Sequence, residues 1–327
     1  MNKPFVWLTR QIFEPAIQKI SEVAEVEIWP GENPPPSDVI LEKVQQAEGL
    51  LTMLTDPITA SVIENAPRLK VISQMAVGFD NIDVDAATRR GIPVGHTPGV
   101  LTETTADFAW ALLMAAARRV VEANREVHQG IWRAWGPNVL TGVDVHGATL
   151  GIIGFGRIGQ AVARRARGFS MKVLYNDPQR DEQAEKTLNV EYKDLDTLLQ
   201  ESDFISLHTY YTPQLHHLIN RQRFEQMKEG AIFINTARGG LVDHQALQWA
   251  LESKKLAAAA LDVFDPEPIP AGHPLLQLPN LIITPHIASA STFTRQKMAF
   301  IAAENLIAGL GGEKLTFCAN PQVYQAG

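Results

Sequence analysis

A glycine-rich turn between a strand pattern and a helix pattern constrains the fold of this chain more than any other feature. Residues 149–180 read TLGIIGFGRIGQAVARRARGFSMKVLYNDPQR and hold Gly154, Gly156 and Gly159 in the spacing G-x-G-x-x-G. The first glycine permits a tight turn, the second lets the backbone approach a pyrophosphate, and the third lets helix and strand pack closely. A bare match is weak, but the strand before it and the amphipathic helix after it are the context that the motif requires. The segment therefore predicts dinucleotide binding.

An acid at the end of the next strand pattern strengthens this prediction. Asp177 is placed to accept hydrogen bonds from a ribose diol, although alone it would equally be a turn residue before Pro178. Arg157 lies inside the glycine loop and is a candidate phosphate contact, with a solvated arginine as the alternative.

Short apolar runs alternate with helical patterns in two series along the chain. Such alternation predicts an α/β fold with parallel sheets that are covered on both faces. Long helical stretches at 102–129 and 288–310 flank the second series, so we expect the second unit to be inserted into the first. Strands are expected at 5–8, 26–29, 49–54, 69–75 and 92–96 in the first series, and at 149–153, 172–175, 204–207, 231–235, 257–261 and 281–284 in the second.

Composition excludes several classes of partner and compartment. With 327 residues the chain has room for two cores, and its net charge of −7 argues against nucleic acid or a membrane surface as a partner. Its single cysteine, Cys318, excludes an internal disulfide and indicates a reducing compartment. No apolar stretch is long enough to span a membrane, and the apolar run near the first residue is too short for the core of a signal peptide. We expect a cytoplasmic protein.

Three further segments place residues with potentially catalytic side chains at predicted strand ends of the second series. FINTARGG (233–240) presents Arg238, LDVFDPEP (261–268) presents Glu267, and ITPHIAS (283–289) presents His286. Loops at these ends converge over the cofactor crevice of a doubly wound sheet. An arginine suits the grip on a carboxylate, a histidine suits proton donation, and a glutamate beside it would fix its tautomer and favour its protonated form. Each residue alone could be an ordinary surface group, but together they form a coherent catalytic set.

These segments resemble the family of D-isomer-specific 2-hydroxyacid dehydrogenases, and the resemblance covers nearly the whole chain. It includes QMAVGFDNIDVDAATRRGIPVGHTPG (74–99), and it is strongest toward the glyoxylate and hydroxypyruvate reductases. It implies two doubly wound domains: a Rossmann NAD(P)-binding domain at 102–286, inserted into a flavodoxin-like substrate domain at 1–101 and 287–327. It also implies NAD(P)H-dependent reduction of glyoxylate to glycolate and of hydroxypyruvate to D-glycerate, with Arg238, Glu267 and His286 as catalytic residues and His286 as the proton donor.

The resemblance assigns further residues. The backbone amides of Val77 and Gly78 would grip the substrate carboxylate, while Thr105 would touch the cofactor and Asp262 would meet the nicotinamide carboxamide. Tyr210 and Leu215 depart from the family's proline and threonine, which puts loop contacts near the adenosine in doubt. The full set of predicted cofactor contacts is Thr105, Gly154, Gly156, Arg157, Ile158, Gly159, Asp177, Arg180, Thr236, Ala237 and Asp262.

Cofactor choice depends on two residues of opposite charge. Asp177 stands where the 2′-phosphate of NADP would lie, and like charges repel there, so NADH is the predicted cofactor. Arg180 lies three residues further on and could pair with that phosphate, so NADPH is expected to be usable but weaker.

Other features leave alternatives open. Met53 and Leu54, at a predicted strand end, are expected to line the pocket for the substrate side chain, whereas Trp135 is better explained by packing. The Ala-rich stretch 102–129 is a candidate surface for a homodimer. A dinucleotide-sensing binding protein of the corepressor type could use the same fold without turnover. A metal site in HTYYTPQLHH (208–217) is disfavoured, because no carboxylate there has ligand spacing.

Overall fold

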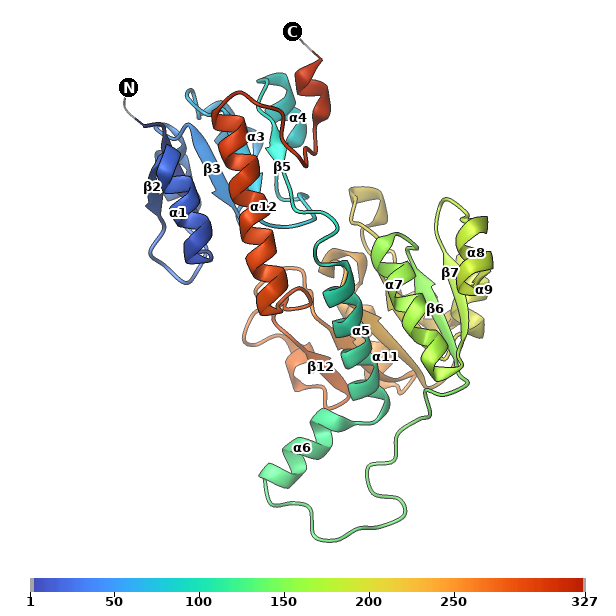
Figure 1. Ribbon diagram of the computed structural model, residues 1–327. Helices are drawn as coiled ribbons and strands as arrows, with labels where there is room; N and C mark the ends of the chain where they lie inside the picture. Colours follow the sequence, from blue (N-terminus) through green and yellow to red (C-terminus); the bar gives the residue numbers. More distant parts are fainter. Residues whose placement is uncertain (1–2, 326–327) are drawn as a thin grey trace. The chain divides into compact units, whose positions relative to one another are not determined.

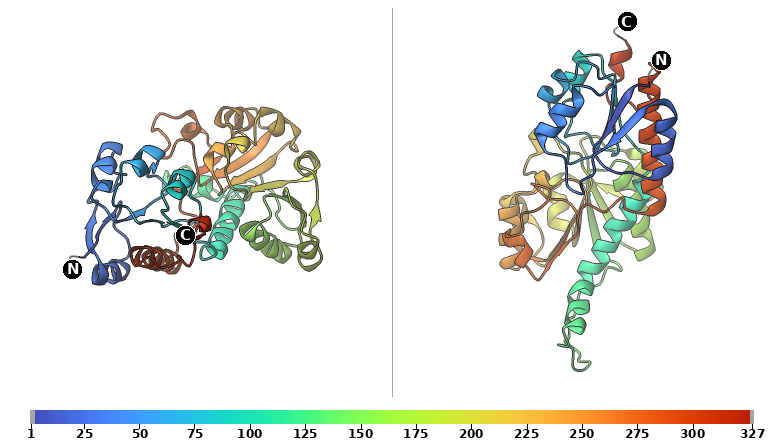
Figure 2. Two further views of the ribbon diagram at one scale, coloured as in Figure 1. Left: turned by 90° about the horizontal axis from the view of Figure 1, so that it is seen from above. Right: turned by 90° about the vertical axis from the view of Figure 1, so that its left-hand side faces the viewer.

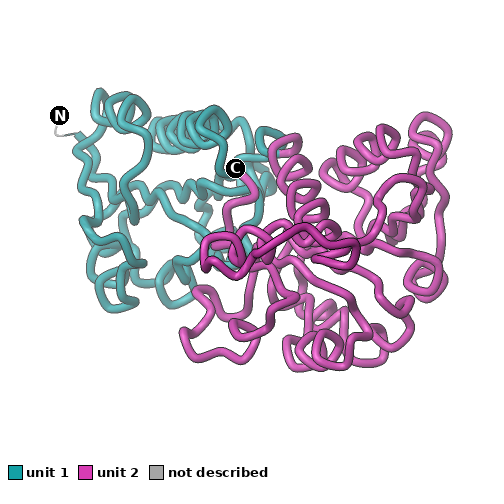
Figure 3. The backbone as a smooth tube through the Cα atoms, turned by 90° about the horizontal axis from the view of Figure 1, so that it is seen from below, with its two compact units in different colours: residues 1–101, 290–327 teal, residues 102–289 magenta. Residues whose placement is uncertain are grey.

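The computed structural model describes residues 3–325, and the chain in it forms two compact units. One unit comprises residues up to 101 together with residues from 290 onward, and the other comprises residues 102–289 (Figure 3). Residues 287–289 remain with the second unit because the backbone N–H groups of Ile287 and Ala288 donate to the Asp262 carboxylate.

The first unit is built on a parallel sheet of five strands in the order β2-β1-β3-β4-β5. The order 2-1-3-4-5 is that of flavodoxin-like doubly wound folds. Its strands are β1 (Phe5–Leu8), β2 (Glu25–Ile28), β3 (Gly49–Thr52), β4 (Val71–Gln74) and β5 (Val94–Gly95), and its helices are α1 (Glu14–Val23), α2 (Ser37–Val44), α3 (Ala60–Glu64), α4 (Val84–Arg89) and α12 (Thr292–Leu310).

Both faces of this sheet are covered, because successive side chains of a strand point to opposite faces. On β1, Trp7 packs in the same cluster as the apolar side chains of α2, α3 and α4. Its neighbours Val6 and Leu8 pack with α1 and α12 on the other face. The run of apolar residues in each strand is therefore explained by burial on both sides.

The second unit is built on a parallel sheet of seven strands in the order β12-β11-β10-β9-β6-β7-β8. Numbered from β6, this is the Rossmann order 3-2-1-4-5-6 with one further strand, so the predicted α/β fold class is confirmed. Its strands are β6 (Thr149–Ile153), β7 (Lys172–Asn176), β8 (Glu191–Tyr192), β9 (Phe204–Leu207), β10 (Ala231–Asn235), β11 (Leu256–Leu261) and β12 (Leu281–Ile283), and its helices are α5 (Thr102–Ala117), α6 (Val120–His128), α7 (Arg157–Ala166), α8 (Glu182–Leu188), α9 (Leu195–Glu201), α10 (Arg221–Gln226) and α11 (His244–Glu252).

The stretch 102–129 is two helices, and the prediction of a single long helix was wrong. Arg119 adopts a left-handed backbone with φ of 52° and ends the regular hydrogen-bonding pattern between α5 and α6. Its guanidinium is then held by Glu122 on the first turn of α6. The break separates a buried helix from an exposed one.

The two helices of this stretch, which the sequence suggests as a dimer surface, differ in how far they are buried. The Ala-rich face of α5 packs into the core of its own unit, with Ala106, Ala109 and Ala116 all buried. In contrast, α6 has no buried residue, and Figures 1 and 2 show it and the following chain extending away from the sheet of its unit. Large apolar side chains are exposed along this arm, which we define as residues 119–143: Val120, Val121, Val127, Ile131, Trp132, Trp135, Val139 and Val143.

Within residues 3–325, no helix has both the length and the apolar character that crossing a membrane would require.

Candidate active site

The carboxyl ends of neighbouring parallel strands bring the predicted site residues of the second unit to one edge of its sheet. Gly154 follows β6, Arg238 follows β10, Asp262 follows β11, and His286 follows β12. In doubly wound folds this edge binds the ligand, next to the point where the strand order reverses. Here the order reverses between β6 and β9, directly at Gly154.

His286 and Glu267 form a hydrogen-bonded pair. The Nδ1 atom of His286 lies 2.8 Å from Oε2 of Glu267, and the side chains are 27% and 21% exposed. The other carboxylate oxygen, Oε1, accepts from the backbone N–H of Phe264 at 2.9 Å, which fixes the carboxylate. Because Nδ1 is engaged by Glu267, Nε2 is the ring atom left to exchange a proton with a ligand.

The backbone of His286 is held in an uncommon conformation by Asp262. His286 has φ of 54°, and its N–H donates to the carbonyl of Asp262 at 2.9 Å. The fully buried Asp262 carboxylate accepts from the Thr284 hydroxyl at 2.6 Å and from the N–H groups of Ile287 and Ala288 at 2.9 and 2.7 Å. A left-handed non-glycine residue persists only where its surroundings impose it. Asp262 thus positions His286, a role that the sequence did not indicate.

Arg238 lies on a loop that a buried asparagine organises. The Asn235 side chain accepts from the N–H of Ala237 and donates to the carbonyl of Arg238, both at 2.9 Å. One guanidinium nitrogen of Arg238 donates to the Ala237 carbonyl at 2.8 Å. Asn235 was assigned only as a strand end, and a buried amide side chain at that position is the signal for its role.

The loop of Arg238 packs directly against the loop of Glu267. A Cβ atom added at Gly239 would lie 1.9 Å from the carbonyl carbon of Phe264, so only a glycine fits between them. Phe264 is also the residue whose N–H binds Glu267. The structure therefore brings the arginine loop, the glutamate and the histidine together. Their spacing along residues 233–289 could not show this.

The glycine loop has the open geometry that a pyrophosphate needs. Gly154 has φ of 90°, and an added Cβ would lie 2.5 Å from the Thr209 backbone nitrogen. At Gly159 it would lie 2.3 Å from the Gly154 carbonyl oxygen. At Gly156, by contrast, nothing lies within 4 Å, and α7 begins at the next residue. Free space in front of a helix N-terminus fits a bound phosphate, so the residues present fit a dinucleotide.

Other predicted cofactor residues take defined positions. Asp177 accepts from the N–H of Phe155 at 2.8 Å and of Gln179 at 3.0 Å, which turns its carboxylate toward the glycine loop. Thr236 is buried, and its hydroxyl has no hydrogen-bond partner among the residues that the structure describes. Thr105 is buried in α5, and Arg157 and Ile158 form the first turn of α7.

We expect Gly156→Ala to separate cofactor binding from folding. The added methyl group meets no protein atom but occupies the space before α7, so dinucleotide affinity should fall at least about tenfold while the melting temperature stays unchanged. Gly154→Ala should instead destabilise the fold by about 1–3 kcal/mol, because its backbone is left-handed and Thr209 blocks the Cβ. Calorimetric titration with NADH and thermal unfolding measure both effects. Equal loss of stability in the two variants would contradict these roles.

His208, which follows β9, is a half-buried histidine that contacts a serine of the same strand. Its Nε2 lies 2.7 Å from the Ser206 hydroxyl, and burial lowers the pKa of its imidazole from 6.5 to about 4. His216 and His217 stack on each other with ring centroids 3.9 Å apart. Among the described residues, no group of three or more His, Cys, Asp or Glu side chains is arranged to hold a metal ion.

The lowered pKa of His208 predicts a loss of stability in acid. Between pH 6.5 and about 4 the unfolded chain binds a proton that the folded chain does not, so stability falls as the pH drops through this window. The loss amounts to at most about 3 kcal/mol. Chemical unfolding at pH 7 and pH 4.5 should show a smaller difference in His208→Gln, which retains a polar partner for Ser206. An unchanged pH dependence in that variant would exclude His208 as the cause.

In the first unit, the predicted substrate residues lie on loops after adjacent strands. Met53 and Leu54 follow β3, and Val77 and Gly78 follow β4, its neighbour in the sheet. All four residues are partly exposed, so none of them is buried in the core.

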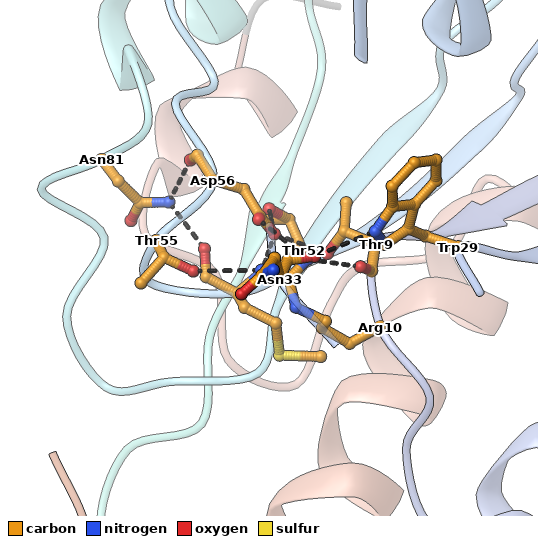
Figure 4. A network of polar contacts seen from close by, with 9 residues as sticks. Thr9, Arg10, Trp29, Asn33, Thr52, Thr55, Asp56 and Asn81 are labelled. Atoms are coloured by element: carbon orange, nitrogen blue, oxygen red, sulfur yellow. Dashed lines mark hydrogen bonds and ion pairs between the residues drawn. The ribbon is translucent and has the colours of Figure 1, made fainter. Parts of the chain in front are cut away.

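A polar network that sequence reasoning missed supports these two loops (Figure 4). The fully buried Asp56 carboxylate accepts from the Thr52 hydroxyl at 3.0 Å and from the Met53 N–H at 2.7 Å. The Asn81 amide donates to the carbonyls of Met53 and Asp56 at 2.9 and 2.7 Å. Gln74 in turn donates to Asn81 at 2.7 Å. This network ties the loop after β3 to the loop after β4.

Taken together, the Rossmann strand order and the open glycine loop define a dinucleotide-binding protein, with an Arg-Glu-His set at the ligand-binding edge. The NAD binding domain of the D-isomer specific 2-hydroxyacid dehydrogenase family matches residues 110–288. A glyoxylate reductase of Korarchaeum cryptofilum (strain OPF8) is 55% identical over 324 residues, which cover 99% of this chain and 98% of that protein. This chain therefore belongs to the D-isomer specific 2-hydroxyacid dehydrogenases.

Solved structures agree with this assignment. The TT0316 protein from Thermus thermophilus superposes with a TM-score of 0.91 at 48% identity, covering 96% of this chain and 99% of that one. An NADPH-dependent glyoxylate/hydroxypyruvate reductase from Sinorhizobium meliloti, solved with NADP and malonate, has a TM-score of 0.85 at 29% identity and 98% coverage of both chains.

Proposed function

We propose that this protein reduces small 2-oxo acids, glyoxylate to glycolate and hydroxypyruvate to D-glycerate, with NADH preferred over NADPH. The observation that carries the proposal is the His286–Glu267 pair, held at the carboxyl edge of the dinucleotide-binding sheet beside the Arg238 loop. The name of the relative from Korarchaeum cryptofilum, a glyoxylate reductase, supports the choice of substrate.

In the proposed mechanism the protein binds, polarises and protonates the substrate. Arg238 pairs with the carboxylate and draws electron density from the adjacent carbonyl. Protonated His286 donates from Nε2 to the carbonyl oxygen, which becomes the product hydroxyl, while Glu267 keeps Nδ1–H engaged and stabilises the charged ring. The chemistry that the nicotinamide supplies when bound is the hydride for the carbonyl carbon. Neutral His286 then regains a proton from solvent.

The remaining assignments belong to the same proposal. Residues 102–286 act as the dinucleotide-binding domain, and residues 1–101 with 287–327 act as the substrate domain. The amides of Val77 and Gly78 bind the substrate carboxylate, and Met53 and Leu54 contact the group that distinguishes one 2-oxo acid from another. Asp262 is proposed to meet the nicotinamide carboxamide.

Asp177 supports the preference for NADH. Its carboxylate faces the glycine loop, where a ribose diol would donate hydrogen bonds and a 2′-phosphate would be repelled. Relatives differ in this choice, since the Sinorhizobium meliloti reductase is NADPH-dependent.

Steady-state kinetics with glyoxylate, hydroxypyruvate and pyruvate, each with NADH and NADPH, test the proposal. We expect turnover of the first two and a higher kcat/KM with NADH. Binding of NADH without oxidation by any 2-oxo acid would contradict the proposal and favour the corepressor-type alternative.

We also propose that the protein is a homodimer that uses the arm, residues 119–143. Trp132 and Trp135 are 58% and 84% exposed, and contiguous exposed apolar groups of this size mark interaction surfaces. Light scattering should give about twice the chain mass of 36.0 kDa, and Trp132→Ser with Trp135→Ser should shift it toward the monomer. A monomeric wild-type protein would refute this assignment.

A further inference from the structure

A bidentate ion pair engages Arg180, the arginine that the sequence offered as a partner for a 2′-phosphate. Arg180 donates from Nε to Oε1 of Glu185 at 2.8 Å and from Nη2 to Oε2 at 2.9 Å. Glu185 lies on α8, whose N-terminus immediately follows the loop that carries Asp177 and Arg180. The planar fork of the guanidinium is therefore matched to a carboxylate of the protein itself.

Glu185 is in turn fixed by a buried tyrosine. The Tyr175 hydroxyl, at the end of β7, donates to Oε1 of Glu185 at 2.8 Å and accepts from the N–H of Asp181 at 2.9 Å. Tyr175 has no exposed surface and stacks on Phe155 of the glycine loop with ring centroids 4.0 Å apart. The ion pair is thus anchored to the dinucleotide loop rather than free on the surface.

The protonation states support a persistent pair. Hydrogen bonds from Arg180 and then Tyr175 lower the pKa of the Glu185 carboxyl to about 2, so it is charged across the physiological range. Burial, together with the bond to Glu185, raises the pKa of Tyr175 to about 12, so its hydroxyl keeps the proton that it donates.

We infer that Glu185 is a specificity-determining residue: by holding Arg180 in this fork it withholds the guanidinium from a 2′-phosphate and so discriminates against NADPH. The effect of this discrimination on catalysis rests on the proposed function, whereas its effect on ligand binding does not. Asp177 repels the phosphate directly, whereas Glu185 acts through Arg180 as a positioning residue. To present this same Nε and Nη2 fork to a 2′-phosphate, Arg180 must first give up both hydrogen bonds to Glu185, and that cost is absent for the NADH ribose.

Binding of adenosine phosphates without a nicotinamide tests this without any turnover. Calorimetric titration compares 2′,5′-ADP, which carries the 2′-phosphate, with 5′-AMP, which does not. In Glu185→Gln the affinity for 2′,5′-ADP should rise about tenfold, because the neutral amide holds Arg180 less strongly than a carboxylate. The affinity for 5′-AMP should stay within about twofold of the wild type.

Matched variants separate this role from general effects. Glu182→Gln removes the same charge from the same helix, where Glu182 makes no hydrogen bond to Arg180, and should change the affinity for 2′,5′-ADP by less than about threefold. Adding Arg180→Ala to Glu185→Gln should abolish the gain. Should Glu185→Gln fold poorly, Glu185→Asp keeps the charge but shortens the side chain, and it should give a gain in the same direction.

Three results would overturn the inference: an equal gain for both ligands, a gain that survives Arg180→Ala, or an equal gain from Glu182→Gln. Failure of the proposed function has a different signature. Absence of 2-oxo acid reduction would leave the contrast between the two adenosine phosphates intact.

Discussion

In His286→Asn we expect the rate of 2-oxo acid reduction to fall by about 10²–10⁴-fold, because asparagine keeps a polar side chain but has no proton to release as a general acid. Binding of NADH should stay close to normal, since His286 is fixed by Glu267 and Asp262 and not by the glycine loop. Single-turnover kinetics under saturating substrate and titration with NADH measure the two quantities. A variant with near wild-type turnover would refute the acid assignment.

Glu267→Gln serves as a graded control for this prediction. The amide retains an acceptor for the Phe264 N–H but loses the charge that stabilises protonated His286. Its rate should therefore fall less than that of His286→Asn. An equal or larger loss would mean that Glu267 is itself the proton donor or that its loop has collapsed, and the melting temperature separates those two cases.

Gly239→Ala should damage both stability and catalysis. The added Cβ would overlap the backbone of Phe264, so the loops of Arg238 and Glu267 must separate. Forced overpacking typically costs about 1–3 kcal/mol, and a displacement of about 1 Å at reacting groups can cost about 10²-fold in rate. We expect a lower melting temperature together with a lower kcat and a higher KM for the 2-oxo acid.

Gly272→Ala is the matched control, because an added Cβ there meets nothing within 4 Å. It should be indistinguishable from the wild type in both assays. If Gly239→Ala behaved like this control, the contact between the two loops would not matter for the site.

The parts of the fold that could be predicted from sequence are those that local patterns determine. The doubly wound class followed from alternating strands and helices, and Gly154, Gly156 and Gly159 indicated the dinucleotide loop because their spacing reflects a local backbone requirement. The break at Arg119 was missed, since nothing in an Ala-rich helical pattern indicates a left-handed residue. Strand β8 was missed because it is short and exposed and has no apolar run.

The supporting groups of the site were missed for a different reason. Asp262 binds the N–H of Ala288, which only the folded chain brings near it. Asn235 and Asp56 each bind a backbone group three residues away, but their local sequence does not show that these polar side chains are buried. Glu185 looked like one acid among many on a helix, and only its contacts with Arg180 and Tyr175 distinguish it.

The hydrogen bonds of Asp262 have a mechanical consequence for the crossing between the two units. They clamp the chain as far as Ala288, and the hydroxyl of Ser291 already caps α12 by accepting from the Thr294 N–H at 3.2 Å. Only Ser289 and Ala290 lie between these two anchors, so backbone rotation along this connection is confined to their dihedral angles. The backbone next to His286 is thereby anchored to its own unit before this two-residue connection begins.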